Sequence, residues 1–268
     1  MRKLLPLFVG MGVTILMFSC TKDKTSDTVA TSIITEDVLM QIAAKGFSNK
    51  DVSKTDGGYI VEGDIFIAEQ DLQSRPAWQT LDIATEQYRT NNLVSVAGGS
   101  RTITLQVSSK LPAAYVTAID EVVARFNAQN LTLRFSRVNS GGNIFFERSN
   151  RGAQYLASAG FPSSNGTPYG KVTVNSYYLG NNPGTAYLAS ILAHETGHCI
   201  GFRHTDYMNR SFSCGGAAYN EGASSIGAVL IPGTPSGPDA NSFMLSCIGR
   251  GENRPFNAND RIALNELY

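Results

Sequence analysis

Histidine is scarce in this chain: its 268 residues include three histidines, and all three lie between positions 194 and 204. Cysteine is nearly as scarce, with four residues in all, which excludes a small fold held together by many disulfides. Basic and acidic residues balance at 22 each and form no basic run, so nucleic-acid binding has no support. The length suffices for the core of one sizeable domain.

Long apolar runs are also missing, except at the N-terminus. Arg2 and Lys3 precede an apolar stretch, residues 4–18, that contains proline and glycine and is too short to span a bilayer. This pattern indicates a signal peptide. Because Ser19-Cys20 follows, the site resembles a bacterial lipoprotein cleavage site, and we expect residues 1–20 to be a signal peptide that ends at an acylated Cys20. An ordinary signal peptide with an incidental cysteine is the alternative.

Export has two consequences. Residues 21–34 are expected to form a polar tether, and the protein to be a cell-envelope lipoprotein (outer membrane, periplasmic or surface-facing) or else secreted, with the lipid as its sole membrane contact. The remaining cysteines, Cys199, Cys214 and Cys247, would meet oxidising conditions, which predicts one disulfide and one spare thiol. Their pairing stays open.

The three histidines belong to the motif H-E-T-G-H-C-I-G-F-R-H at residues 194–204. His194 and His198 are four apart, so on a helix both imidazoles project from one face and can share a zinc ion. Gly201 can adopt the left-handed conformation that ends a helix, after which the chain can bring His204 back as a third ligand. A bare H-E-x-x-H also occurs by chance on surface helices, but the added glycine and third histidine favour a zinc site.

Glu195 lies next to the first ligand and can act on a water without binding the metal. Three imidazoles leave the fourth position of zinc open, which is typical of catalytic sites. Cys199 lies about 100° round the helix from His198, and we interpret it as structural.

The periodicity of the remaining chain predicts short strands and helices. We expect a capped helix from Thr35 to about Gly46 and partial helix within 71–88. A second helix is expected with Pro112 at its first position, ending near Gln129, and the zinc helix with Asn182 as its cap. Strands are expected at 59–61, 65–67, 103–107, 131–135, 143–147, 152–159 (an edge strand) and 171–178, and a final helix at 259–268.

These features resemble the metzincin zinc metallopeptidases. The resemblance implies an α+β fold with a mixed twisted sheet, an antiparallel edge strand, a backing helix, the zinc helix and a loop-rich C-terminal part. It also implies that Met244 forms an apolar floor under the zinc site. Some metzincins carry a tyrosine two residues after this methionine, but Ser246 stands there, so that role is not transferred. Tyr207 and Arg203 are candidates to replace it.

More specifically, the chain resembles the bacterial dual-action H-E-I-G-H metallopeptidases, which include a myxobacterial protease. The zinc motif is the specific part, and Thr196 departs from the usual Ile. Further shared stretches are Val61-Glu62-Gly63-Asp64, Gln87-Tyr88-Arg89-Thr90, Thr205-Asp206-Tyr207, Ser213-Cys214-Gly215, Pro232-Gly233-Thr234-Pro235 and Arg254-Pro255-Phe256-Asn257.

The resemblance places the peptidase domain at residues 98–268 and leaves 35–97 as a small N-terminal segment. That segment is interpreted as a subdomain, with an inhibitory pro-segment as the alternative. If Cys20 is acylated, a cysteine switch is excluded, because no other cysteine precedes Cys199. An aspartate such as Asp64 could mask the metal instead.

The predicted function is zinc-dependent hydrolysis of peptide bonds in proteins, with Glu195 as general base. Two alternatives remain: a non-catalytic surface lipoprotein that keeps the zinc fold as a binding module, and a zinc amidase acting on cell-wall peptide. The resemblance allows calcium in the loops of this fold, but the sequence holds no clear aspartate-rich calcium loop that would support it. We expect a monomer that acts on protein or peptide substrates.

Overall fold

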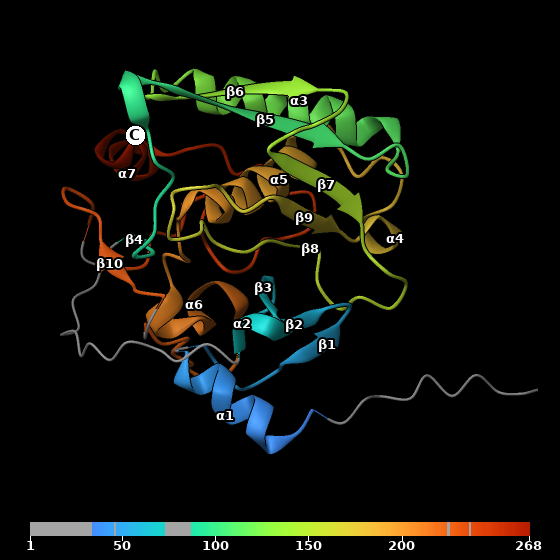
Figure 1. The fold of residues 1–268 in the computed structure, drawn as a ribbon, viewed down its shortest axis with the longest axis vertical. Helices are drawn as coiled ribbons and strands as arrows, with labels where there is room; N and C mark the ends of the chain where they lie inside the picture. Colours follow the sequence, from blue (N-terminus) through green and yellow to red (C-terminus); the bar gives the residue numbers. More distant parts are fainter. Residues whose placement is uncertain (1–33, 46, 73–86, 224–225, 236) are drawn as a thin grey trace, which may run out of the picture. The chain divides into compact units, whose positions relative to one another are not determined.

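The largest sheet in the described part of the chain has five strands of mixed direction, and the helix with the first two histidines of the motif packs against it (Figure 1). The computed structural model describes residues 34–45, 47–72, 87–223, 226–235 and 237–268. The strand order is β6-β5-β7-β9-β8; β8 is antiparallel to its neighbour and the others run parallel. This confirms the α+β fold with an antiparallel edge strand. The bounds are β5 Arg101–Val107, β6 Leu133–Val138, β7 Ile144–Arg148, β8 Ala157–Ser158 and β9 Lys171–Val174.

Two helices pack against each other and against this sheet, α3 (Ala113–Asn127) and α5 (Thr185–Ile200). Strand residues alternate between faces, and on β5 Ile103 and Leu105 are fully buried whereas Thr102 is exposed. Side chains of β5, α3 and α5 belong to one apolar core. The core therefore lies between the sheet and the two helices, and α5, which carries His194 and His198, contributes side chains to it.

The N-terminal part has its own sheet and its own apolar cluster. Its elements are α1 (Glu36–Ala44), β1 (Ser53–Thr55), β2 (Gly58–Val61), β3 (Ile65–Ala68) and α2 (Glu69–Leu72), and the three strands are antiparallel in the order β1-β2-β3. The Thr35 hydroxyl caps α1, as expected. The buried cluster is formed by Ile42, Phe47, Tyr59, Val61, Ile65, Ile67 and Leu72.

Short elements connect the rest: β4 (Tyr88–Arg89), η1 (Ala97–Gly99), α4 (Ser176–Leu179), η2 (Tyr207–Asn209), α6 (Ser211–Cys214) and β10 (Val229–Leu230), with α7 (Ala258–Leu267) last. β4 pairs with β10. The structure joins Cys214 to Cys247 in a disulfide and leaves Cys199 as a buried free thiol.

Several predicted boundaries were wrong. Pro112 is the N-cap of α3 instead of its first residue, and α3 ends at Asn127. The strand expected at 131–135 is shifted to Leu133–Val138. The strand expected at 171–178 stops at Val174, because the Asn175 side chain accepts the Tyr178 N–H and caps α4.

The start of the zinc helix also differs from the prediction. Gly184, with φ 98°, is the N-cap of α5 instead of Asn182, since only glycine adopts that conformation readily. Tyr88 lies in β4 instead of a helix; residues 73–86, which complete that expectation, lie outside the described residues.

Residues 1–33 likewise lie outside the described residues, so the signal peptide and most of the tether stay predictions, as does the boundary at 97. No helix in the described ranges is long and apolar enough to cross a bilayer.

Candidate metal centre

Helix α5 presents His194 and His198 one turn apart, within a segment in which every residue from Tyr187 to Ile200 is buried. The helix ends at Gly201, whose φ of 115° lies in the left-handed region. A Cβ at this position would lie 2.7 Å from Leu93 Cδ2 and 3.0 Å from the Asn92 carbonyl oxygen. Conformation and space therefore both require glycine where the chain leaves the helix.

The reversal after Gly201 is held by backbone pairing with β4. The Thr90 N–H donates to the Gly201 carbonyl at 2.8 Å, and the Arg203 N–H donates to the Tyr88 carbonyl at 2.9 Å. These bonds fix the chain direction immediately before His204. The Q-Y-R-T stretch thus has a structural role that the sequence did not reveal: it directs the third histidine back towards α5.

Each of the three imidazoles is oriented through its Nδ1 atom. His194 Nδ1 lies 2.9 Å from the Phe243 carbonyl oxygen, and His198 Nδ1 lies 2.9 Å from that of Phe202. His204 Nδ1 lies 3.1 and 3.0 Å from the two oxygens of Glu221. Since these partners are acceptors, each Nδ1 carries the hydrogen, and the Nε2 atoms are left for a metal ion.

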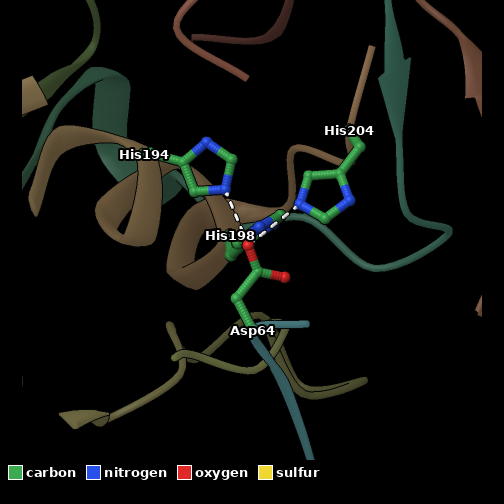
Figure 2. A group of neighbouring side chains, drawn as sticks. All are labelled: Asp64, His194, His198 and His204. Atoms are coloured by element: carbon green, nitrogen blue, oxygen red, sulfur yellow. Dashed lines mark hydrogen bonds and ion pairs between the residues drawn. The ribbon is translucent and has the colours of Figure 1, made fainter. Parts of the chain in front are cut away.

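One ligand atom from each of the three histidines and from Asp64 lies within 4.8 Å of the other three, and Figure 2 shows Asp64 between His194 and His204. Asp64 Oδ2 lies 3.3 Å from His194 Nε2 and 3.2 Å from His204 Nε2. His198 Nε2 is buried and has no hydrogen-bond partner within the described part of the chain. An orphaned imidazole nitrogen beside two others and a carboxylate fits zinc, which takes nitrogen and oxygen ligands.

The charges of this cluster fit the same interpretation. Burial, followed by the neighbouring histidines, holds the pKa of His198 well below its usual value, so its ring is neutral. Burial on its own lowers the pKa of His204, but the carboxylates of Glu221 and Asp64 outweigh burial and raise this pKa well above its usual value. The two carboxylates thus favour a positively charged His204 ring, and a metal ion at its Nε2 would take the place of a proton there.

Glu195 lies beside the cluster with 2 % of its surface exposed. Burial, with the Asp64 carboxylate as the next cause, raises the pKa of Glu195 well above its usual value. Its Oε2 is buried without a hydrogen-bond partner in the described ranges. Glu195 also lines a cavity of about 220 Å³ together with Asp64, His194, Leu156, Ile191, Leu245 and Ile248. Glu195 thus lies at the wall of a partly apolar cavity, next to the candidate metal ligands.

Met244 lies close to Gly197 of α5. Its side chain is fully buried, and a Cβ at Gly197 would lie 2.5 Å from Met244 Sδ. The Met244 carbonyl accepts the Thr205 N–H at 3.0 Å. Met244 therefore packs against the helix turn between His194 and His198, and its carbonyl is hydrogen-bonded to the residue that follows His204.

Glu221 was missed by the sequence analysis. It lies in a loop rich in glycine and serine, where no spacing rule links a carboxylate to a histidine 17 residues earlier. Glu62, His204 and Glu221 form a second buried group whose atoms could hold a metal. Glu62, however, bonds to Arg203 and the Ser48 N–H, and Glu221 bonds to His204. We interpret this group as a hydrogen-bond network around His204.

The two candidates to replace the metzincin tyrosine do not face the cavity. The Arg203 guanidinium donates to Glu62 and to the carbonyls of Gly222 and Gly227. The Tyr207 ring packs edge-on against the Tyr88 ring, with their centroids 4.4 Å apart. Among the described residues, the side chains lining the cavity include Arg210 and Ser246 instead.

A family model described as dual-action HEIGH metallo-peptidase matches residues 59–268. Among solved structures, the chain is similar to high choriolytic enzyme 1, a hatching enzyme zinc-protease from Oryzias latipes (medaka fish), with 17% identity, a TM-score of 0.40, and 66% of this chain and 93% of that chain covered. It is also similar to myroilysin, with 14% identity and a TM-score of 0.40; the match covers 65% of this chain and 83% of the myroilysin chain. No curated protein matches the sequence.

Proposed function

Since the chain belongs to the dual-action HEIGH metallo-peptidase family, we propose that His194, His198 and His204 hold its catalytic zinc and that Glu195 is its general base. The supporting observation is the convergence of the three Nε2 atoms, each on a ring whose Nδ1 faces an acceptor. Such a ring arrangement fixes the tautomer that binds a metal.

In this mechanism the residues of the chain move protons and position the substrate. Zinc, when bound, supplies Lewis acidity at the scissile carbonyl and lowers the pKa of the attacking water. Glu195 takes the proton of the water that attacks the carbonyl carbon, and then delivers it to the leaving amide nitrogen. The low exposure of Glu195 keeps bulk solvent away from this transfer.

The substrate is proposed to be an extended segment of a protein. The edge strand β8 offers backbone groups for pairing with an added strand, and the cavity next to Glu195 is lined by Leu156, Ile191, Leu245 and Ile248. An apolar side chain of the substrate would fit there. Pairing along an edge favours cleavage within chains over trimming of ends.

Substitution of Glu195 tests this function. In the zinc-loaded protein, we expect Glu195→Gln to keep the bound zinc and to lower hydrolysis of an internally quenched peptide by about 10²–10⁴-fold. Glu121→Gln, which removes a partly exposed carboxylate that pairs with Arg125 on α3, serves as the control. Full activity of Glu195→Gln would contradict the assignment of the base.

Mass spectrometry of cleaved proteins and of cell-wall peptide separates a protein endopeptidase from an amidase.

We further propose that the protein is exported and anchored through Cys20, as the sequence analysis predicts. Ser19 alone separates Cys20 from the apolar stretch at residues 4–18. Metabolic labelling with an alkyne fatty acid should mark the wild-type protein and not Cys20→Ser. Equal labelling of Cys20→Ser would show that the leader is an ordinary signal peptide or that the acylated residue lies elsewhere.

A further inference from the structure

A second cavity lies beside the cavity that Glu195 lines. Its volume is about 470 Å³, and its walls include Leu156 and Ile248, which also line the first cavity. Its other walls come from α4, from the start of α5 and from residues 250–251. Because the two cavities share these two side chains, a peptide bound next to Glu195 can continue from the first cavity into the second.

Helix α5 runs along both cavities. Ile191 and His194 line the first cavity, and Tyr187 lines the second; residues three or four apart lie on one face of a helix. Tyr187 and His194 are seven positions apart, which corresponds to roughly 10 Å along the helix axis. Since an extended peptide rises about 3.3 Å per residue, this distance matches roughly three residues of substrate.

Two hydrogen-bond donors in the second cavity have no partner in the protein. Tyr187 has 5 % of its surface exposed, and its hydroxyl has no hydrogen-bond partner in the described ranges. Arg250 is exposed and forms no ion pair with any described residue. A buried hydroxyl without a partner is unusual in a folded protein, so the cavity offers an unmet donor beside a free guanidinium.

The pKa of Tyr187 places these two groups near each other. Burial, and after it the neighbouring Tyr178, raises this pKa, whereas the positive charge of Arg250 acts in the opposite direction. The Tyr187 hydroxyl therefore stays protonated at neutral pH and can donate a hydrogen bond to a ligand that Arg250 also contacts.

The second cavity also lies at the start of α5. Asn182 and Pro183, which precede the N-cap Gly184, line it, and no side chain caps the helix. The N-terminus of a helix carries a partial positive charge. Of the described residues that line the cavity none is acidic, and Arg250 is the charged one. The local charges therefore favour an anionic ligand.

From these groups, and on the basis of the proposed function, we propose that the second cavity binds a carboxylate of the substrate, about three residues from the scissile bond. The Arg250 guanidinium and the Tyr187 hydroxyl are its donors. Such a carboxylate belongs to an aspartate or glutamate side chain or to the C-terminus of a peptide. The peptidase therefore selects among extended substrates by a charge that lies away from the zinc site.

The first test compares rates of hydrolysis by the zinc-loaded full chain. Internally quenched peptides carry Asp or Asn at one position, scanned from the third residue before the cleaved bond to the third after it. Each peptide ends in a free carboxylate or in an amide. At one position, kcat/KM for the Asp peptide should exceed that for the Asn peptide at least about fivefold, since charged hydrogen bonds are the stronger ones. A C-terminal ligand would instead appear as the same preference for the free carboxylate over the amide. Equal kcat/KM throughout both series would overturn the proposal.

Variants then test the two donors. Arg250→Gln and Tyr187→Phe should lower kcat/KM for the acidic peptide more than for its neutral counterpart, whereas general damage to the fold would lower both to the same extent. Arg134→Gln makes the same charge change at an exposed position of β6, at the opposite edge of the sheet from β8, and should keep the full preference. A preference that survives Arg250→Gln undiminished would overturn the proposal.

Direct binding separates this inference from the proposed function. Zinc-loaded Glu195→Gln should bind the acidic peptide at least about fivefold more tightly than the neutral one in calorimetry, and added salt should reduce the difference because Arg250 is exposed. If the wild type cleaves no peptide but this difference in affinity is present, the proposed function is wrong and the carboxylate site stands. Cleavage of all peptides without any difference in rate or affinity would refute the carboxylate site alone.

Discussion

The Glu221 carboxylate accepts the Nδ1–H of His204 with both oxygens, at 3.1 and 3.0 Å, and neither side chain is exposed. Ser246 Oγ donates to the same carboxylate at 3.2 Å, and Arg210 Nη1 lies 3.5 Å from it. Glu221 is therefore fixed on several sides, and it determines both the tautomer and the ring orientation of His204.

Loss of Glu221 should weaken the metal site without removing a ligand. We expect Glu221→Ala to lower zinc affinity by about 10–100-fold, as measured by chelator competition. Glu221→Gln keeps an acceptor for the Nδ1–H and should lose less. Glu121→Gln provides the matched control, and equal zinc affinity of Glu221→Ala and the wild type would refute the positioning role.

Gly197 should tolerate no larger residue. A Cβ there would lie 2.5 Å from Met244 Sδ and 3.0 Å from Phe243 Cε2, and overpacking typically costs about 1–3 kcal/mol. This outweighs the gain of about 1 kcal/mol that Ala brings to a helix, so we expect Gly197→Ala to lower the urea midpoint and zinc affinity. Gly237→Ala, where a Cβ meets nothing within 4 Å, should change neither; a more stable Gly197→Ala would argue against the close packing.

The Cys214–Cys247 disulfide should stabilise the wall of the cavity. It closes a loop with a sequence separation of 33, for which the chain-entropy model gives about 3–4 kcal/mol. Cys247 also lines the cavity. We therefore expect Cys214→Ser/Cys247→Ser to lower Tm and raise KM. Reductant should lower the Tm of the wild type and of Cys199→Ala but not that of the double variant; an equal response in all three would disprove the assigned pairing.

Stability should fall at alkaline pH partly through Tyr115. Its hydroxyl donates to the Gly180 carbonyl at 2.8 Å, and burial raises the pKa of Tyr115 to about 12. An unfolded tyrosine ionises near pH 10, so the unfolded chain releases its proton first and stability is lost as pH rises from about 10 to 12.

The matching experiment compares Tyr115→Phe with the wild type in urea. Below pH 10, Tyr115→Phe should be less stable by about 1 kcal/mol, the size of one lost hydrogen bond. Above pH 10 the difference should shrink, and it should change sign before pH 12, since one pKa unit corresponds to about 1.4 kcal/mol. Tyr178→Phe, at a side chain that is 67% exposed, should show no such change. A constant difference at every pH would exclude Tyr115 as the titrating group.

The sequence motif was sufficient to predict local features. Spacing of four on a helix brings His194 and His198 together wherever α5 lies, and Gly201 ends that helix through its own conformational freedom. Alternating apolar residues likewise predicted β5. Boundaries were less predictable: the Asn182-Pro183 pair looks like a helix start, but Gly184 supplies the backbone turn that begins α5.

Contacts between distant parts of the chain could not be predicted in the same way. Asp64 meets His194 across 130 positions and Glu221 bonds to His204 across 17. Neither pair has a characteristic separation in the sequence, because the tertiary fold brings these residues together and the repeat of a helix or a strand does not. Asp64 could be considered as a mask for the metal from the sequence, but only the position of the β2–β3 hairpin locates it at the imidazoles.

The hairpin contacts also affect how fast the site can form. Asp64 lies 140 positions before His204, and Glu62 lies 141 before Arg203. Contacts between such distant positions form slowly, because the entropy of closing a long loop is lost before the contact can form. Helix α5, which carries His194 and His198, needs only local contacts and can form much earlier. During refolding, the helix that carries His194 and His198 should therefore form well before Asp64 arrives beside either His194 or His204, so the cluster is completed in two separate stages.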